Sequence, residues 1–248
     1  MSGSGQMAAI TYARYDLIRV VRNRRFFIFS LGFPLVLFLV IAGPNQHSKL
    51  GGIPFPVYYM TGMVAFGTMN AVVAGGGIIA LERQVGWTRQ LRITPLPAWA
   101  YILSKVIRGY AMACVSIAVL YVAGVALGVN LPIVGWLLMT GLIFVGLLPF
   151  SALGILLGHL LSPDSLGPAL GGLSALFALL GGAWGPLANK GALLTIAKGL
   201  PSYWLVQAGK AGLTESAWPA TGWIVIAVWT VVLGRLAMIV YKRDSGRP

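Results

Sequence analysis

Charged residues are scarce in this sequence. Only 9% of the 248 residues are charged, only five are Asp or Glu, and 58% are hydrophobic, with a mean hydropathy of +0.84. A soluble domain carries about 25% charged residues, which cover its surface with polar groups. The shortage excludes an ordinary cytosolic enzyme, a disordered tail and a nucleic-acid-binding domain. We therefore expect an integral membrane protein.

The residue types that carry catalysis are also few. His47 and His159 are the only histidines, which excludes an H-E-x-x-H metal site, and the single Cys114 excludes an internal disulfide. The patterns G-x-S-x-G and GxxxxGK[ST] do not occur. We predict no metal site, no cofactor and no ATP site in this chain, so the energy for any driven process must come from another polypeptide.

Long apolar stretches fill most of the sequence. A membrane-crossing helix needs about 20 apolar residues, and six stretches meet this length or approach it. The predicted fold is all-α, with residues 1–248 forming a single transmembrane domain. The predicted spans are 26–43, 55–81, 109–129, 133–161, 165–187 and 218–241.

Local signals refine two of these spans. Pro149 is expected to bend the fourth span. At the start of the fifth, Ser162 is suited to the N-cap, Pro163 to the first helical position and Asp164 to the positive end of the helix dipole. Glycines spaced four apart predict a tightly packed bundle, with or without a second copy: Gly124/Gly128, Gly154/Gly158 and Gly167/Gly171. The run 75–77 of three glycines could serve as a hinge or allow close packing.

Basic residues lie mainly on one side of the predicted membrane. With six spans both termini share a side, and that side holds fourteen of the 18 Lys and Arg residues. The other side holds Lys49, Lys190, Lys198 and Lys210. This asymmetry fits the positive-inside rule, places both termini in the cytoplasm and accounts for the net charge of +13 without nucleic acid.

Acidic residues are expected at or beyond the ends of the predicted spans. They are Asp16, Glu82, Asp164, Glu215 and Asp244. His159 lies near the inner end of the fourth span, where a structural role is the simpler interpretation. A proton-coupled carrier or a channel with a charged filter would require buried ionisable groups, so both classes are disfavoured.

The N-terminal residues 7–25 show helical spacing of apolar residues, with arginines on the other side. A basic amphipathic helix beside a span lies in the plane of the lipid headgroups. We predict such an interfacial helix, which either anchors the topology or also contacts a cytoplasmic partner.

The segment 82–97 carries the most specific pattern. It reads ERQVGWTRQLRITPLP, an acid–base pair at a helix end followed by a short amphipathic piece that Pro95 and Pro97 terminate. This pattern, with Leu103-Ser104-Lys105 after it, resembles the first cytoplasmic loop of ABC-2 type transporter permeases. Residues 200–208, LPSYWLVQA, are similar to the P-x-Y-W-x-x-x-A element of the same family, and the resemblance covers nearly the whole chain.

The resemblance implies the partners and the site. It implies two permease copies, here a homodimer, with two separate ATPase subunits that bind ATP and Mg, in the bacterial cytoplasmic membrane and in contact with its lipids. A short coupling helix between the second and third spans would face the ATPases, and short extracellular helices would precede the sixth span. The residues implied for coupling are Glu82, Arg83, Gly86, Arg89 and Arg92.

The cargo is predicted only as a class. Aromatic and Met side chains on the second and fifth spans suit an adaptable apolar pathway. The pathway residues predicted in this way are Tyr59, Phe66, Met69, Asn70, Phe177 and Trp184. We expect an exporter of a drug, an antibiotic or a lipid-like compound. The alternatives are an exporter of lipid-linked glycans, a stand-alone carrier or channel, and a membrane-embedded enzyme.

Overall fold

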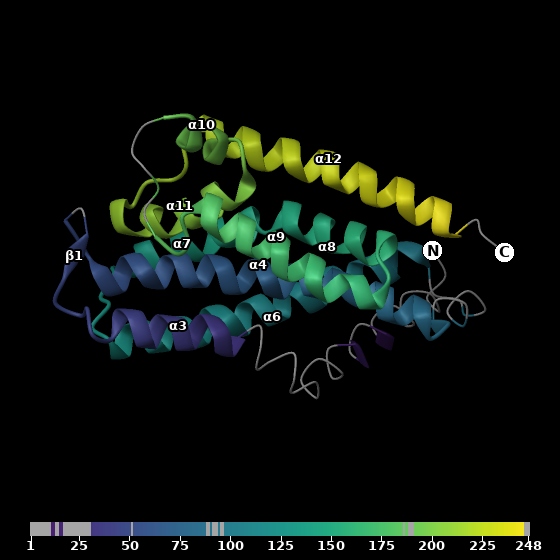
Figure 1. Cartoon of the computed structure of the whole chain (residues 1–248), viewed down its shortest axis with the longest axis horizontal. Helices are drawn as coiled ribbons and strands as arrows, with labels where there is room; N and C mark the ends of the chain where they lie inside the picture. Colours follow the sequence, from purple (N-terminus) through teal and green to yellow (C-terminus); the bar gives the residue numbers. More distant parts are fainter. Residues whose placement is uncertain are drawn as a thin grey trace.

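The protein is a bundle of long helices (Figure 1). The computed structural model describes residues 11, 12, 15, 16, 31–50, 52–87, 90, 94, 97–185, 187 and 191–245. The helices are α3 (Phe33–Ala42), α4 (Phe55–Gln84), α6 (Ala98–Ala126), α7 (Ile133–Gly146), α8 (Leu148–Leu160), α9 (Pro163–Gly181), α10 (Ala192–Lys198), α11 (Pro201–Thr214) and α12 (Ala220–Ser245). The two short strands β1 (Lys49–Leu50) and β2 (Ile53–Pro54) pair as an antiparallel hairpin between α3 and α4.

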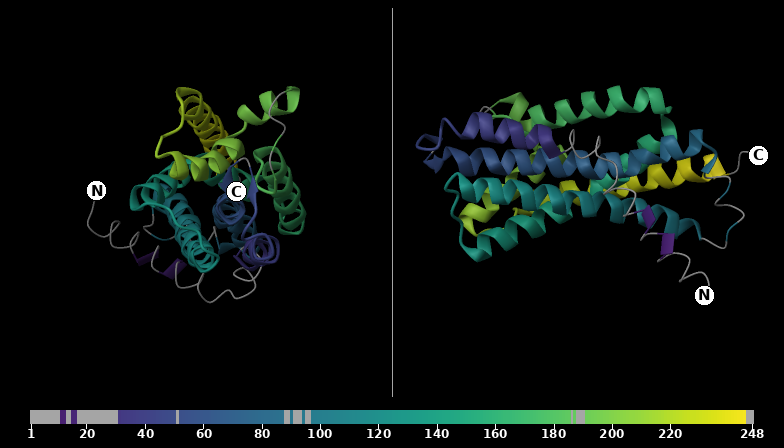
Figure 2. Two further views of the ribbon diagram at one scale, coloured as in Figure 1. Left: turned by 90° about the vertical axis from the view of Figure 1, so that its left-hand side faces the viewer. Right: turned by 90° about the horizontal axis from the view of Figure 1, so that it is seen from below.

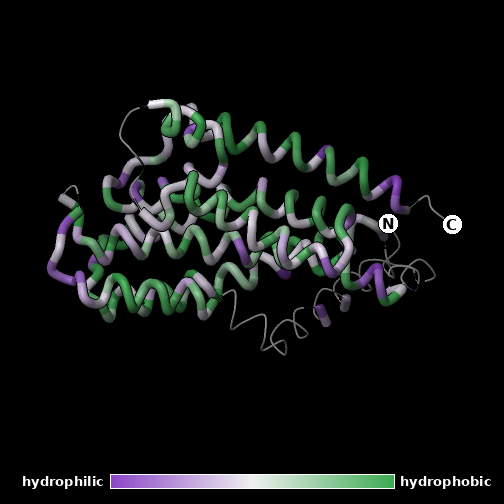
Figure 3. The backbone as a smooth tube through the Cα atoms, in the orientation of Figure 1, coloured by the Kyte–Doolittle hydropathy of each residue, from purple (hydrophilic) through white to green (hydrophobic). Residues whose placement is uncertain are grey.

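Helix α4 forms the centre of the bundle. It contacts α3, α6, α8, α9 and α11, and 78% of its most apolar window is buried. The view along the bundle in Figure 2 shows the other helices arranged around it. Helix α12, by contrast, is only 17% buried over its apolar window and presents a largely hydrophobic surface (Figure 3). A helix that is apolar and exposed in this way requires lipid around it.

Glycines allow the central helices to approach each other closely. A Cβ on Gly154 would lie 2.9 Å from the Cα of Val73, and one on Gly76 would lie 2.5 Å from the carbonyl carbon of Gly154. A Cβ on Gly158 would lie 2.6 Å from the carbonyl oxygen of Gly76. The predicted tight packing is therefore confirmed between α4 and α8, and the run 75–77 has a packing role, with Gly76 against α8 and Gly75 against Gly109 of α6. Gly167 on α9, however, faces open space.

Among the residues that the structure describes, five helices are long and apolar enough to cross a membrane. They are Phe55–Gln84, Trp99–Ala126, Ile133–Leu160, Pro163–Gly181 and Ala220–Asp244. The chain is therefore a multi-pass membrane protein. The first predicted span, 26–43, contains the shorter helix α3, and its residues 26–30 lie outside the described part of the chain.

The local signals at Pro149 and Ser162 are confirmed. The predicted fourth span is two helices, α7 and α8, which meet at Leu147, because Pro149 at the start of α8 has no N–H to donate. The backbone N–H of Ser165 donates to Oγ of Ser162 over 3.4 Å, so Ser162 is the N-cap of α9. Helix α9 ends at Gly181, and Gly182 continues with a φ of 76°, a conformation that favours glycine.

Helix α6 differs from the prediction. It begins at Ala98, well before the predicted span of 109–129, and includes Lys105 and Arg108. The helix continues through these residues because both cations have carboxylate partners inside the protein.

The two ends of the bundle carry different elements. The end of α4, the start of α6 and the last turn of α12 meet at one end of the bundle, where ion pairs join them. We call it the network end. The hairpin, α10 and α11 lie toward the opposite end (Figure 1). Helix α11 runs alongside α7, with Leu205 beside Gly146 and Gly212 beside Gly135, so it is packed within the bundle.

Candidate functional site

Glu82, in the last turn of α4, is buried, and both of its carboxylate oxygens accept hydrogen bonds. The hydroxyl of Tyr101 donates to Oε2 over 2.7 Å, and Nζ of Lys105 donates to Oε1 over 2.7 Å. Tyr101 and Lys105 are four residues apart on α6 and therefore lie on the same helix face. That face is turned toward α4 at the point where the close approach of Gly75 and Gly109 holds the two helices together.

Lys105 is the centre of a buried charge network. It is 1% exposed and also donates to Oδ2 of Asp16 and to the hydroxyl of Tyr12, both over 3.2 Å. Nη1 of Arg108 donates to the other carboxylate oxygen of Asp16 over 3.1 Å. We name Asp16, Glu82, Lys105 and Arg108 the buried charge network. Its two acids and two bases cancel, which makes its burial possible.

The aromatic rings of Tyr12 and Tyr101 complete the surroundings of this cation. Nζ of Lys105 lies 5.3 Å from the ring centroid of Tyr12 and 5.0 Å from that of Tyr101, within the range of a cation–π interaction. The ammonium thus has two carboxylates, a hydroxyl and two ring faces around it. Through Tyr12 and Asp16 the network attaches the N-terminal segment to α4 and α6.

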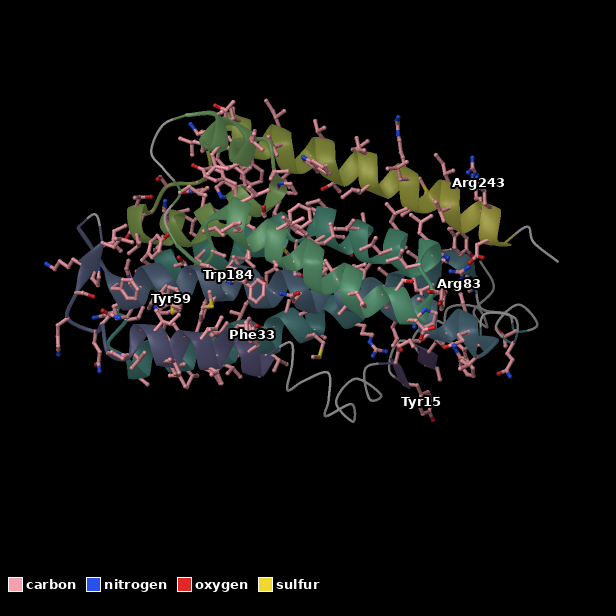
Figure 4. All side chains as sticks on the ribbon, viewed as in Figure 1. Tyr15, Phe33, Tyr59, Arg83, Trp184 and Arg243 are labelled. Atoms are coloured by element: carbon pink, nitrogen blue, oxygen red, sulfur yellow. The ribbon has the colours of Figure 1, made fainter. Side chains whose placement is uncertain are left out.

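Arg83 makes a second set of contacts on the neighbouring side of α4. Its Nη1 donates to the carbonyl oxygen of His159 over 2.7 Å, and its Nε lies 2.9 Å from Oδ2 of Asp244. Nδ1 of His159 lies 3.0 Å from the same carboxylate oxygen. Arg83 therefore joins the ends of α4, α8 and α12, and His159 has the structural environment that its position in the sequence indicated. Figure 4 shows Arg83 and Arg243 at this end of the bundle.

The five residues implied for coupling divide into three groups. Glu82 and Arg83 point into the bundle and hold the end of α4. Gly86 follows the helix with a φ of 72° and open space around it. Arg89 and Arg92 lie outside the described residues. The helix end itself is exposed at Val85, and Nε1 of Trp87 donates to the hydroxyl of Tyr12 over 3.4 Å.

Sequence reasoning missed five members of this site: Tyr12, Asp16, Tyr101, Lys105 and Arg108. The four-residue spacing of Tyr101 and Lys105 ahead of an apolar run was a visible signal, since it places a hydroxyl and an amine on one helix face. Asp16 offered no local signal, because its partners are 89 and 92 positions away in the sequence.

The predicted pathway residues lie mostly in the hydrophobic core. Tyr59, Phe66 and Met69 are buried on α4, and the side-chain amide of Asn70 donates to the carbonyl oxygen of Phe66 over 2.9 Å. Phe66 and Trp184 meet edge to face, with ring centroids 5.6 Å apart. Phe177 makes a similar contact with Phe150, at 5.4 Å. The structure thus brings Phe66 and Trp184 together, whereas Phe177 packs elsewhere.

Replacing Asp16 with asparagine should loosen the N-terminal segment. The change removes the anion that pairs with Arg108 and one of the two that pair with Lys105, and we expect a loss of about 2 kcal/mol in the free energy that holds the segment in place. Hydrogen exchange at the amides of residues 11–16 measures this release, while the amides of α6 should stay protected. Asp164→Asn is the matched control, since Asp164 is exposed at the start of α9. Equal exchange in the two variants would contradict the role of Asp16.

These features define a class: a multi-pass membrane subunit whose central helix ends in buried ion pairs beside an exposed turn. Residues 8–213 match the family ABC-2 type transporter. The chain therefore belongs to the ABC-2 type transporter family, and it is an ABC transporter permease.

A relative in Bacillus subtilis (strain 168) supports the same assignment. That protein, named "Putative transport permease YvfS", is 30% identical over 192 residues, which cover 76% of this chain and 78% of the relative. Membership of this family implies association with ATPase subunits. The chain is thus a transport component that works with a separate ATPase.

Proposed function

We propose that this chain is the transmembrane subunit of an ATP-driven exporter in the bacterial cytoplasmic membrane. It would move a hydrophobic or amphipathic compound, such as a drug, an antibiotic or a lipid-like molecule, out of the cell. The observation that carries the proposal is the family match over residues 8–213. The absence of a GxxxxGK[ST] loop from the sequence agrees with a subunit that has no enzymatic activity and no cofactor, with ATP and Mg bound by the partner.

The proposed topology has six spans and cytoplasmic termini. Helix α3 would form the membrane-embedded part of the first span, since it packs against α4 and α6 and exposes Val36 and Val40 on its other side. The network end would face the cytoplasm, where most of the basic residues then lie. Helices α10 and α11 would lie toward the outer side.

The coupling surface would be the segment that follows α4, and the ion pairs would transmit its movement. The proposed coupling residues have different roles; they are Glu82, Arg83, Gly86, Arg89 and Arg92. A push on the turn at Gly86 reaches α6 through Glu82 and Lys105, and it reaches α8 and α12 through Arg83. Glu82 and Arg83 are thus positioning residues, and Arg89 and Arg92 would supply the contact with the ATPase.

A second copy of this chain would complete the transporter. Helix α9 is only 22% buried over its apolar window, and added Cβ atoms on Gly167, Gly171 and Gly172 would meet nothing. Small residues on a lipid-exposed helix face allow another helix to pack closely. This face of α9 supports a homodimer.

The cargo pathway would open along α4 when the helices move. Tyr59, Phe66, Met69, Asn70, Phe177 and Trp184 remain the proposed pathway residues. Trp184 is 38% exposed and touches the buried Phe66, so a shift of α9 relative to α4 would expose aromatic surface of the kind that binds apolar compounds.

Replacing Gly86 with alanine should uncouple ATP hydrolysis from transport. A residue with a side chain is strained at a φ of 72°, at a cost of about 1 kcal/mol, so the turn would change direction without any clash in the bundle. The permease is co-expressed with an ATPase subunit and reconstituted in vesicles, where cargo release and ATP hydrolysis are measured together. We expect two permease chains to co-purify with the ATPase. The amount of cargo transported per ATP hydrolysed should be at least about tenfold lower in the variant than in the parent protein.

Gly128→Ala is the matched control. Gly128 has a φ of 84° and open space, but it lies in the turn between α6 and α7, at the opposite end of the bundle. The control should transport as the parent protein does. Equal uncoupling in both variants, or transport by the permease without any ATPase, would refute the proposal.

A further inference from the structure

Two cavities flank the helix α11, away from the network end. The larger, of about 630 Å³, lies between α11 and the first turns of α12, and Trp204, Trp218 and Val225 contribute apolar wall. The smaller, of about 180 Å³, lies between α11, Tyr58 of α4 and the end of α9. The same four side chains line both: Lys198, Tyr203, Gln207 and Lys210.

No acidic side chain in the described walls of these cavities neutralises their lysines. No ion pair within the described part of the chain involves Lys198 or Lys210, and no acidic residue is among the described residues that line either cavity. Of the five acids in the sequence, three are held in ion pairs at the network end and Asp164 begins α9. Glu215 remains; it is exposed between Thr214 and Ser216 of the larger cavity, but it lines neither cavity itself. These cavities therefore carry a net positive charge.

Partial burial of Lys210 makes its charge costly without a ligand, whereas Lys198 is exposed. Helix α11 is not among the helices long enough to span a membrane, and burial there lowers the pKa of Lys210 below its ordinary value. Trp218 also lines the larger cavity, and its buried Nε1 has no acceptor within the described part of the chain. A bound anion would lessen the cost of the half-buried ammonium of Lys210.

The surroundings also indicate the rest of the ligand. The larger cavity adjoins the apolar, lipid-exposed surface of α12, where Trp223 and Ile224 are exposed. Hydroxyl groups of Thr214, Ser216 and Thr221 lie on its rim. The combination of cations, hydroxyls and tryptophans next to lipid fits a molecule with an anionic head and an apolar body.

We propose that Lys198 and Lys210 bind the phosphate or carboxylate head of an anionic amphiphile, whose apolar part lies against Trp204, Trp218 and α12. This inference rests on the proposed function, because it narrows the proposed cargo of the exporter to anionic amphiphiles. The binding itself needs no ATPase and can be measured on the full chain alone.

The test uses dodecyl phosphate and the full chain in phosphatidylcholine nanodiscs, with tryptophan fluorescence as the readout. The parent protein should bind dodecyl phosphate and not dodecyl trimethylammonium. Lys198→Gln and Lys210→Gln should each weaken the binding about tenfold, the effect of one charge-assisted hydrogen bond. Lys210→Arg should retain the affinity. Unfolding midpoints of Lys210→Arg and Lys210→Gln close to that of the parent protein would show that both variants are folded. Lys49→Gln is the control, because Lys49 lies on the exposed hairpin.

The outcomes separate the possible sources of the anion and the two proposals. If phosphatidylglycerol in the nanodisc competes with dodecyl phosphate, a membrane lipid supplies the head; if it does not, a transported amphiphile does, and both results support the site. Equal affinity in the parent protein and both glutamine variants would overturn it. Lysine-dependent binding without ATP-driven transport would refute the proposed function alone, and transport without lysine-dependent binding would refute this inference alone.

Discussion

Replacing Lys105 with methionine should lower the free energy of unfolding by about 3–5 kcal/mol, the usual effect of breaking a buried ion pair from one side. The methionine fills similar space, but it leaves Glu82 and Asp16 with one cation, Arg108, to balance two buried carboxylates. The hydroxyl of Tyr101 is then the remaining described partner of Glu82. Chemical unfolding in detergent, followed by tryptophan fluorescence, measures the loss.

A double variant separates charge imbalance from lost packing. Lys105→Met combined with Glu82→Gln restores neutrality, since Asp16 and Arg108 still pair over 3.1 Å. We expect it to regain more than half of the lost stability. Lys49→Met, at an exposed position, should be within about 0.5 kcal/mol of the parent protein. A single variant at position 105 with unchanged stability would show that the buried charge network does not hold the helices together.

Replacing Gly154 with valine should destabilise the protein by about 3 kcal/mol and separate α4 from α8. The new Cβ would lie 2.9 Å from the Cα of Val73 and 3.0 Å from its carbonyl carbon. These are backbone atoms, which cannot rotate away as a flexible side chain could, so the two helices must move apart. The movement also weakens the contacts of Arg83 with α8, and transport should fall with stability.

Gly141→Val is the control for this prediction. Gly141 lies on α7, which with α8 forms the same apolar segment, and a Cβ there would meet nothing within 4 Å. The substitution should therefore leave the unfolding midpoint nearly unchanged. If the two valine variants unfold alike, the cost comes from valine in the helix and not from the close approach of α4 and α8.

The spans were predictable because they depend on composition alone. In lipid, a stretch such as 55–81 can pair its own backbone N–H and C=O groups by forming a helix. The length of the apolar stretch is therefore enough to identify a spanning helix. Pro149 and Ser162 act on their own helix ends through one missing donor and one side-chain acceptor, and such local effects can be read from a few residues. The resemblance of residues 82–97 to the family could likewise be seen in the sequence, because it depends on residue types within one short segment.

The contacts of the site were not predictable in this way. Lys105 has the composition of a loop residue, and only its carboxylate partners on α4 and the N-terminal segment make it part of a buried helix. The resemblance implies that Glu82 and Arg83 face the ATPase, yet successive residues on a helix face different neighbours, here α6 and α8. The position of α11 inside the bundle also depended on Gly135 and Gly212 meeting across two helices.

The sequence by itself therefore determined the membrane environment and the family. These follow from the free energy of transferring each segment into lipid, which is a sum over its own residues. The tertiary structure decided which charges are neutralised, which helices touch and where the lysines of α10 and α11 face a cavity. An ion pair or a glycine contact joins residues far apart in the chain, and its energy exists only once the helices are packed.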